Sequence, residues 1–125
     1  MKDHKLVKAI QNLKDALVER DREGPSPIND AGVSKCFEVA LEYFWKYLKR
    51  RIEDDGLEAA SPKEAIKVAA TLGLVQKPEQ WIRYINNRNL SVHDYLGVDN
   101  QEYLESIREF SIESESVLAR IEREE

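Results

Sequence analysis

The sequence predicts an all-α protein, an antiparallel up-and-down four-helix bundle with one additional short helix. Apolar residues recur at spacings of three and four through most of the chain, which is the repeat of a helix with one buried face. No stretch alternates apolar and polar residues as a half-buried strand would. Glycine and proline divide the chain into segments joined by short turns, which favours antiparallel packing. A length of 125 residues corresponds to one domain, 1–125.

The first two predicted helices are long. Residues 3–22 form the first, whose apolar face carries Leu6, Ile10, Leu13 and Leu17. Residues 23–32, EGPSPINDAG, contain two glycines and two prolines and are predicted to form a loop. The second helix is predicted over about 30–54. Its inner stripe consists of Val33, Phe37, Leu41, Phe44, Leu48 and Ile52.

Three further helices follow. Ser61 and Glu64 have the spacing of a capping box, with Pro62 in the first turn, and Leu72-Gly73 ends that short helix. Pro78 precedes a helix predicted from residue 79 to about 91, whose apolar residues are Trp81, Ile82 and Ile85. The last helix is predicted over 100–122, after Asp99 and Glu102 at N-cap and N3 spacing. Its apolar repeat is Tyr103, Leu104, Ile107, Phe110, Val117, Leu118 and Ile121.

Composition limits the classes of function. The net charge is −5, which argues against a broad basic surface for nucleic acid, so any contact with RNA or a nucleotide should be local. The single cysteine, Cys36, excludes an intrachain disulfide, and its apolar spacing indicates core packing. The N-terminal segment is too charged for a signal peptide, and no apolar run reaches membrane-spanning length. The protein is therefore expected to be cytoplasmic, with no membrane partner.

The sequence contains two strongly charged regions, and the first has both a binding and a structural interpretation. Late in the second helix, a basic patch of Lys46, Lys49, Arg50 and Arg51 is interleaved with Trp45 and Tyr47. Such a patch can bind a nucleic acid strand through phosphate contacts and stacking. Lysine and arginine also favour the C-terminal end of a helix on dipole grounds alone. Residues 100–125 contain eight acidic residues against three arginines, which indicates a solvated polar face.

The stretch NNRNLSVHDY, residues 86–95, contains the residue types that metal-free RNA cleavage needs. Arg88 offers a fixed fork of donors for a phosphate, and His93 can exchange a proton near neutral pH. RNA supplies its own nucleophile, the 2′-hydroxyl, so no cofactor is expected, and the sequence contains no metal-ligand cluster. On a regular helix Asn89 and His93 share a face, whereas Arg88 and His93 lie roughly 140° apart.

Arg88 and His93 can nevertheless meet by three routes. The helix can loosen between them, the arginine stem can curl around it, or a second copy of the chain can bring them together. In-line cleavage needs both a base and an acid, and the only other histidine, His4, is predicted to lie at the surface. A nuclease of this kind should therefore be a symmetric homodimer with two copies of His93. The alternative is that these polar residues simply compensate the dipole at a helix end.

The motif R-N-x-x-x-H-x-Y, formed by Arg88, Asn89, His93 and Tyr95 with Asp94 in the variable position, resembles that of the HEPN domains. The resemblance is to the nucleotidyltransferase substrate-binding-like, HepT-type toxin branch, and it covers about residues 3–122. It implies an all-helical domain encoded beside a separate minimal nucleotidyltransferase. In many such pairs the HEPN member is a dimeric, metal-independent RNase toxin. The transferase is its antitoxin, in some systems by adding adenylate to the motif tyrosine, here Tyr95.

The resemblance and the residues together favour an RNase toxin. Arg88 and His93 would be catalytic, Asn89 would bind or orient the RNA, and Tyr95 would be the site of adenylylation. The alternative is a non-catalytic nucleotide- or substrate-binding subunit of the nucleotidyltransferase, and a third is a purely structural helical partner. The chain is not the transferase itself, because it contains no Gly-Ser pair and no D-x-D.

Overall fold

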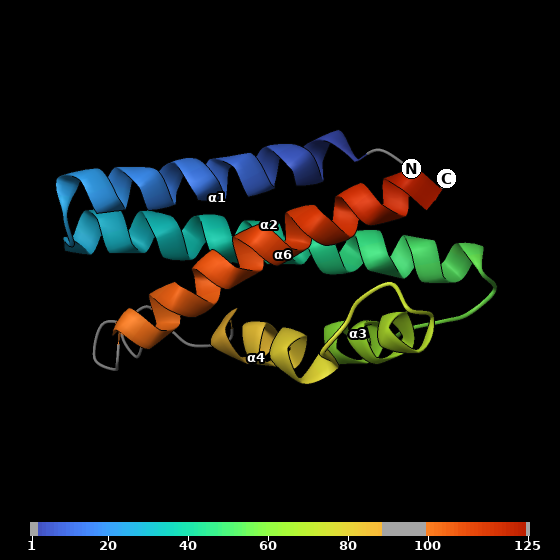
Figure 1. Cartoon of the computed structure of the whole chain (residues 1–125). Coiled ribbons are helices and arrows are strands. Elements are labelled where there is room, and N and C mark those ends of the chain that lie inside the picture. Colours follow the sequence, from blue (N-terminus) through green and yellow to red (C-terminus); the bar gives the residue numbers. More distant parts are fainter. Residues whose placement is uncertain (1–2, 89–99, 125) are drawn as a thin grey trace.

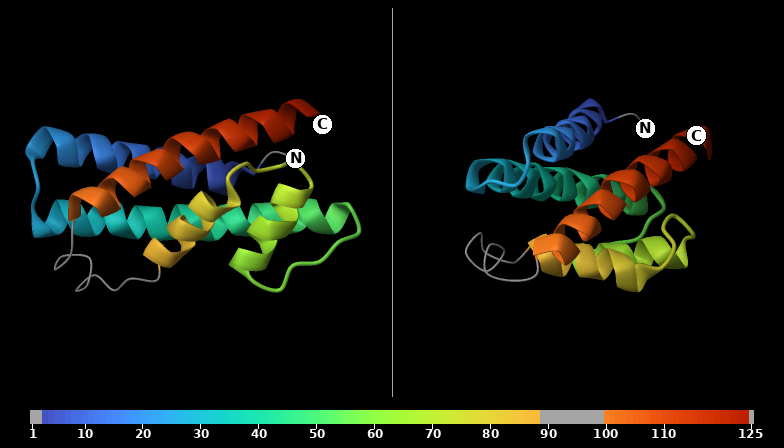
Figure 2. Two further views of the ribbon diagram at one scale, coloured as in Figure 1. Left: turned by 60° about the horizontal axis from the view of Figure 1, so that its bottom comes forward. Right: turned by 60° about the vertical axis from the view of Figure 1, so that its left-hand side comes forward.

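Five α-helices make up the regular structure of the residues that the computed structural model describes, 3–88 and 100–124. They are α1 (His4–Glu23), α2 (Pro27–Asp54), α3 (Pro62–Thr71), α4 (Pro78–Arg88) and α6 (Asn100–Glu124). Helices α1 and α2 run antiparallel side by side, and α6 crosses them obliquely (Figure 1). The short helices α3 and α4 pack against each other and against α2 (Figure 2). The predicted all-α class is confirmed.

A cluster of aromatic rings forms the centre of the core. Phe110 of α6 contacts Phe37 and Phe44 of α2 and Trp81 and Tyr84 of α4, with ring centroids 5.3–6.0 Å apart in edge-to-face geometry. The rings of Phe44 and Trp81 are stacked, 4.8 Å apart and 8° from parallel. Each such pair adds about 0.5–1.5 kcal/mol to the free energy of burial. These contacts hold α4 firmly between α2 and α6.

The start of α2 corrects the sequence prediction. Residues 23–32 were predicted to be a loop, but the helix begins at Pro27. The side chain of Ser26 caps it by accepting a hydrogen bond from the backbone N–H of Asn29, at 3.0 Å. Proline is favourable at the first helical position because its missing N–H is not needed there. Pro27 therefore begins the helix, and Gly32, which was predicted to belong to the loop, lies inside it.

The predicted boundaries of α3 are confirmed. The Ser61 hydroxyl accepts from the N–H of Glu64 at 3.2 Å, and the Glu64 carboxylate accepts from the N–H of Ala60 at 3.2 Å. Gly73 follows the last turn with φ of +76°, a conformation that glycine adopts without strain. Helix α3 has 10 residues and α4 has 11. These two short helices pack against each other and lie together on α2 (Figure 2).

Candidate functional site

The candidate site begins at Arg88, the last described residue of α4. Its guanidinium Nη1 lies 3.3 Å from Oε2 of Glu42 on α2. The other carboxylate oxygen of Glu42, Oε1, lies 3.3 Å from Nζ of Lys46, one turn further along α2. Glu42, Lys46 and Arg88 form what we call the Glu42 cluster. It joins two residues singled out in the sequence through a third that was not.

Two basic side chains of the Glu42 cluster share one carboxylate. Arg88 and Lys46 converge on the two oxygens of one carboxylate, so their charges are directed at the same small anionic group. The cluster carries a net charge of about +1, and the Arg88 side chain is 26% exposed. Guanidinium and ammonium groups placed this way suit a phosphate group, whose oxygens accept from both.

The position of Arg88 depends on polar contacts between α4 and α6. The Tyr84 hydroxyl donates to Oε1 of Glu113 at 2.6 Å and accepts from Nε2 of Gln80 at 2.9 Å. Gln80 also donates to Oε2 of Glu109 at 2.7 Å. Burial and the neighbouring Glu113 carboxylate raise the pKa of Tyr84 far above its usual value. The acidic face of the last helix was predicted to be solvated, but at Glu109 and Glu113 it is part of this half-buried network.

A further contact fixes the last turn of α4. The Asn87 side chain donates from Nδ2 to the hydroxyl of Ser106 on α6, at 2.8 Å. Ser106 is only 9% exposed, so this bond satisfies a buried hydroxyl. Asn87 is therefore a structural residue at the helix end, one position before Arg88.

Comparison with known proteins identifies the family of the chain. Residues 2–123 match the family described as "Nucleotidyltransferase substrate binding protein like". The chain belongs to this family. The family resemblance based on the motif at Arg88–Tyr95 is thereby confirmed.

Two individual proteins extend the comparison. This chain is 28% identical over 105 residues to a protein of Haemophilus influenzae (strain ATCC 51907 / DSM 11121 / KW20 / Rd) named "Probable ribonuclease HepT". The match covers 78% of this chain and 72% of the other. It is also similar to a crystal structure of a protein from Thermus thermophilus, with a TM-score of 0.76 and 30% identity. That match covers 92% of this chain and 97% of the other. In the part of the chain that the structure describes, no helix is both long and apolar enough to cross a membrane.

Three predicted site residues lie outside the residues that the structure describes, namely Asn89, His93 and Tyr95. Asp94 lies outside them as well. The convergence of Arg88 with His93 therefore stays a prediction.

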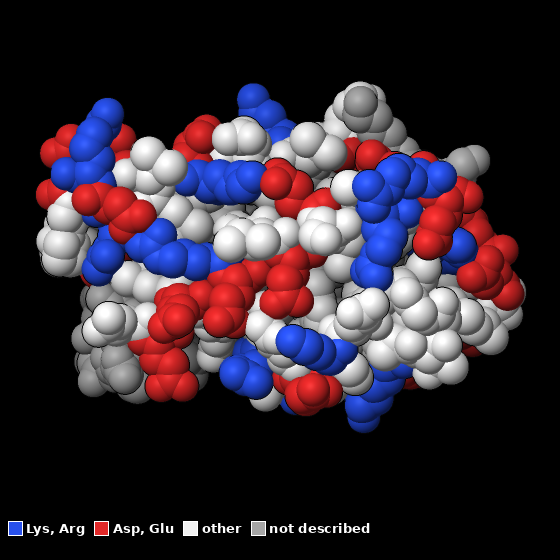
Figure 3. All heavy atoms as spheres, viewed as in Figure 1, with Lys and Arg blue, Asp and Glu red and all other residues white. Residues whose placement is uncertain are grey.

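The predicted aromatic-basic patch is divided by the structure. Lys46 belongs to the Glu42 cluster, whereas Arg50 is ion-paired with Asp3 at the start of α1. Lys49 is half-buried. Tyr47 is fully buried in the core, so its ring is not available for stacking, and at this residue the structural interpretation holds. On the face shown in Figure 3, acidic and basic side chains are interspersed, without one large basic area among the described residues.

Glu42 is the site residue that sequence reasoning missed. Its spacing of four before Lys46 is the one signal the sequence offered, because glutamate and lysine at that spacing pair along a helix. Nothing in the sequence indicates its contact with Arg88, which comes from a different helix.

Proposed function

We propose that this chain is a metal-independent ribonuclease, the toxin of a two-gene module whose other member is a minimal nucleotidyltransferase. The observation that carries the proposal is the Glu42 cluster. In it Arg88 and Lys46 both contact the carboxylate of Glu42, and Arg88 lies five residues before His93 in the sequence. The similarity to a protein named as a probable ribonuclease supports the same conclusion.

The proposed reaction is in-line cleavage by the 2′-hydroxyl of the RNA. A base removes the proton of this hydroxyl while its oxygen bonds to phosphorus. The bond from phosphorus to the 5′-oxygen breaks, and that oxygen takes a proton from an acid. The products are a 2′,3′-cyclic phosphate and a 5′-hydroxyl. Arg88 stabilises the charge that develops on the phosphate oxygens, and His93 transfers the protons.

One chain holds a single histidine in this segment, whereas the reaction needs a base and an acid. Two copies of His93 in a homodimer supply both, at a composite site shared by the subunits. Light scattering tests this step directly. A monomer at micromolar concentration would remove the second proton carrier, and the mechanism with it.

Tyr95 is the proposed site of control by the partner. An adenylate on its hydroxyl adds a phosphodiester, whose negative charge Arg88 can bind in place of an RNA phosphate. Mass spectrometry after co-expression with the neighbouring nucleotidyltransferase tests this. Adenylate on another residue, or on none, would contradict it.

Cleavage of RNA in the presence of EDTA tests the central proposal. Arg88→Ala and His93→Ala should each lower the cleavage rate by about 10²-fold or more, the usual contribution of charge stabilisation or proton transfer. Arg83→Ala is the matched control, because Arg83 lies exposed on the same helix and makes no ion pair with any described residue. Cleavage that survives His93→Ala, or falls equally in Arg83→Ala, would refute the assignment.

The family description favours a second candidate, a non-catalytic subunit that binds a nucleotide or another substrate of the transferase. The Glu42 cluster suits the phosphate of such a ligand as well as that of RNA. RNA that stays intact at a large excess of protein, together with measurable binding of a nucleotide, would decide for the binding subunit.

A further inference from the structure

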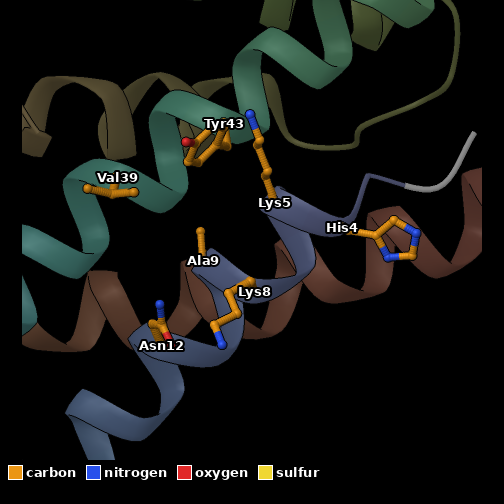
Figure 4. A pocket seen from close by; sticks show the side chains of 7 residues that line it. All are labelled: His4, Lys5, Lys8, Ala9, Asn12, Val39 and Tyr43. Carbon is orange, nitrogen blue, oxygen red and sulfur yellow. The ribbon is translucent and has the colours of Figure 1, made fainter.

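A hollow of about 460 Å³ lies between α1 and α2 (Figure 4). Its lining includes Lys5, Lys8, Ala9 and Asn12 of α1 and Val39 and Tyr43 of α2. The Lys5 side chain extends from α1 toward α2 beside the ring of Tyr43, whereas the Lys8 side chain points the other way, toward Asn12. Ala9 lies between the two helices. The hollow therefore combines an aromatic ring and an apolar floor with a basic rim.

The charges on the rim are not neutralised within the described residues. Lys14, Arg20 and Arg22, further along α1, all form ion pairs with carboxylates. Lys5 and Lys8 form none with any residue that the structure describes. Lys5 also lies in the first turn of α1, where the helix dipole disfavours a cation, so helix stability does not explain its presence. The two ammonium groups remain available to an anionic ligand.

Tyr43 supplies the second element of recognition. It is partly buried and packs against the core. Its hydroxyl makes no hydrogen bond within the part of the chain that the structure describes. Aromatic rings held in this way stack on nucleic acid bases, and every base offers a face for such stacking. A base on the ring, with one phosphate at Lys5 and another at Lys8, would satisfy both features of the hollow.

By helix geometry, the hollow and the Glu42 cluster involve neighbouring faces of α2. Tyr43 follows Glu42 directly in the sequence, and successive residues of a helix point about 100° apart. Val39 lines the hollow, and Lys46 of the cluster lies seven residues later, a rise of roughly 10 Å along the helix. A single strand whose phosphate contacts Arg88 and Lys46 can continue across α2 into the hollow.

We propose that the hollow between α1 and α2 is a second subsite for single-stranded RNA, in which a base stacks on Tyr43 and phosphates of the strand bind Lys5 beside the ring and Lys8 on the opposite side of the hollow. This inference rests on the proposed function, since it gives the RNA strand a path beyond the Glu42 cluster. It assigns the affinity for RNA partly to α1, remote in sequence from the motif.

Binding of a fluorescein-labelled single-stranded RNA with 2′-O-methyl groups, which block cleavage, measures the subsite by fluorescence anisotropy. The double variant Lys5→Gln/Lys8→Gln should raise Kd about tenfold at moderate salt. It should also lower the slope of log K against log salt by about 0.7 for each phosphate that the variant no longer neutralises. The matched control is Lys63→Gln/Lys67→Gln, which removes the same charge from two exposed lysines of α3. The control should bind RNA as the wild type does.

Stacking is tested separately at Tyr43. Tyr43→Phe should bind RNA as the wild type does, and Tyr43→Leu should bind about tenfold more weakly, because a base stacked on an aromatic ring contributes about 1–3 kcal/mol. Circular dichroism confirms that both variants fold. Ultraviolet crosslinking of the wild type should place a labelled uridine on Tyr43.

The outcomes separate the subsite from the ribonuclease. If both lysine double variants weaken binding equally, or if Tyr43→Leu binds like Tyr43→Phe, the subsite is refuted. Cleavage by the wild type in EDTA would then leave the ribonuclease proposal intact. Loss of binding to the nucleotidyltransferase but not to RNA would make the hollow a protein-docking surface and also refute the inference. A wild type that binds no RNA overturns both proposals.

Discussion

Replacing Glu42 separates two roles that its carboxylate has in the Glu42 cluster. It orients Arg88, and it cancels part of the positive charge that attracts RNA. Both ion pairs are partly exposed, so Glu42→Ala should lower the free energy of unfolding by only about 0.5–1.5 kcal/mol. The net charge of the cluster rises from about +1 to +2. One additional charge about 7 Å from a phosphate contributes roughly 0.6 kcal/mol in water, or about threefold in affinity.

The expected result is opposite changes in binding and catalysis. Glu42→Ala should bind the uncleavable RNA about threefold more tightly at low salt, whereas kcat for cleavage should fall about tenfold, because the guanidinium of Arg88 loses its fixed orientation. Glu42→Gln should bind RNA as tightly as Glu42→Ala does but keep most of the wild-type kcat, since its amide oxygen still accepts a hydrogen bond from Arg88. Anisotropy gives Kd, and the rate at saturating RNA gives kcat.

Glu38→Ala is the control for a general change in charge, because Glu38 is exposed one turn earlier on α2 and forms no ion pair with a described residue. The reasoning fails if Glu38→Ala reproduces the effects of Glu42→Ala, or if Glu42→Ala binds RNA more weakly than the wild type.

Three further predictions concern stability. Tyr84→Phe should lower the free energy of unfolding in urea by about 1.5–3 kcal/mol, because the 2.6 Å hydrogen bond to the Glu113 carboxylate is lost inside the structure; an unchanged midpoint would contradict it. Stability should fall as pH rises above about 10, since an unfolded tyrosine releases its proton there while the raised pKa of Tyr84 keeps it protonated in the folded chain. The Tyr84→Phe variant should lose only part of this pH dependence of stability, because burial also raises the pKa of Tyr47 and Tyr103. A wild type whose stability stays constant up to about pH 11 would refute the predicted pH dependence. Ser26→Ala should lower the free energy of unfolding, measured by thermal denaturation, by about 1 kcal/mol, since the Ser26 hydroxyl caps α2. Unchanged stability would favour the longer loop predicted from the sequence.

Local signals in the sequence determined most of the fold. The helical repeat of apolar residues, the cap at Ser61 and the turn at Gly73 each depend on neighbours within about four residues, and the structure confirms them. The same locality explains the error at the start of α2. Gly32 and Pro27 both favour loops on average, whereas the cap provided by Ser26 made Pro27 the first residue of the helix. Family membership also followed from residues close together, through the motif that begins at Arg88.

Only the tertiary structure decided which side chains meet. Tyr47 and Lys46 are adjacent in the sequence, yet Tyr47 faces the core and Lys46 joins the Glu42 cluster. The contact of Glu42 with Arg88 joins residues from two helices, and no periodic pattern encodes it. It exists because the stacking of Phe44 on Trp81 sets how α4 lies on α2. Packing of this kind depends on the shapes of distant side chains, which a sequence pattern does not contain.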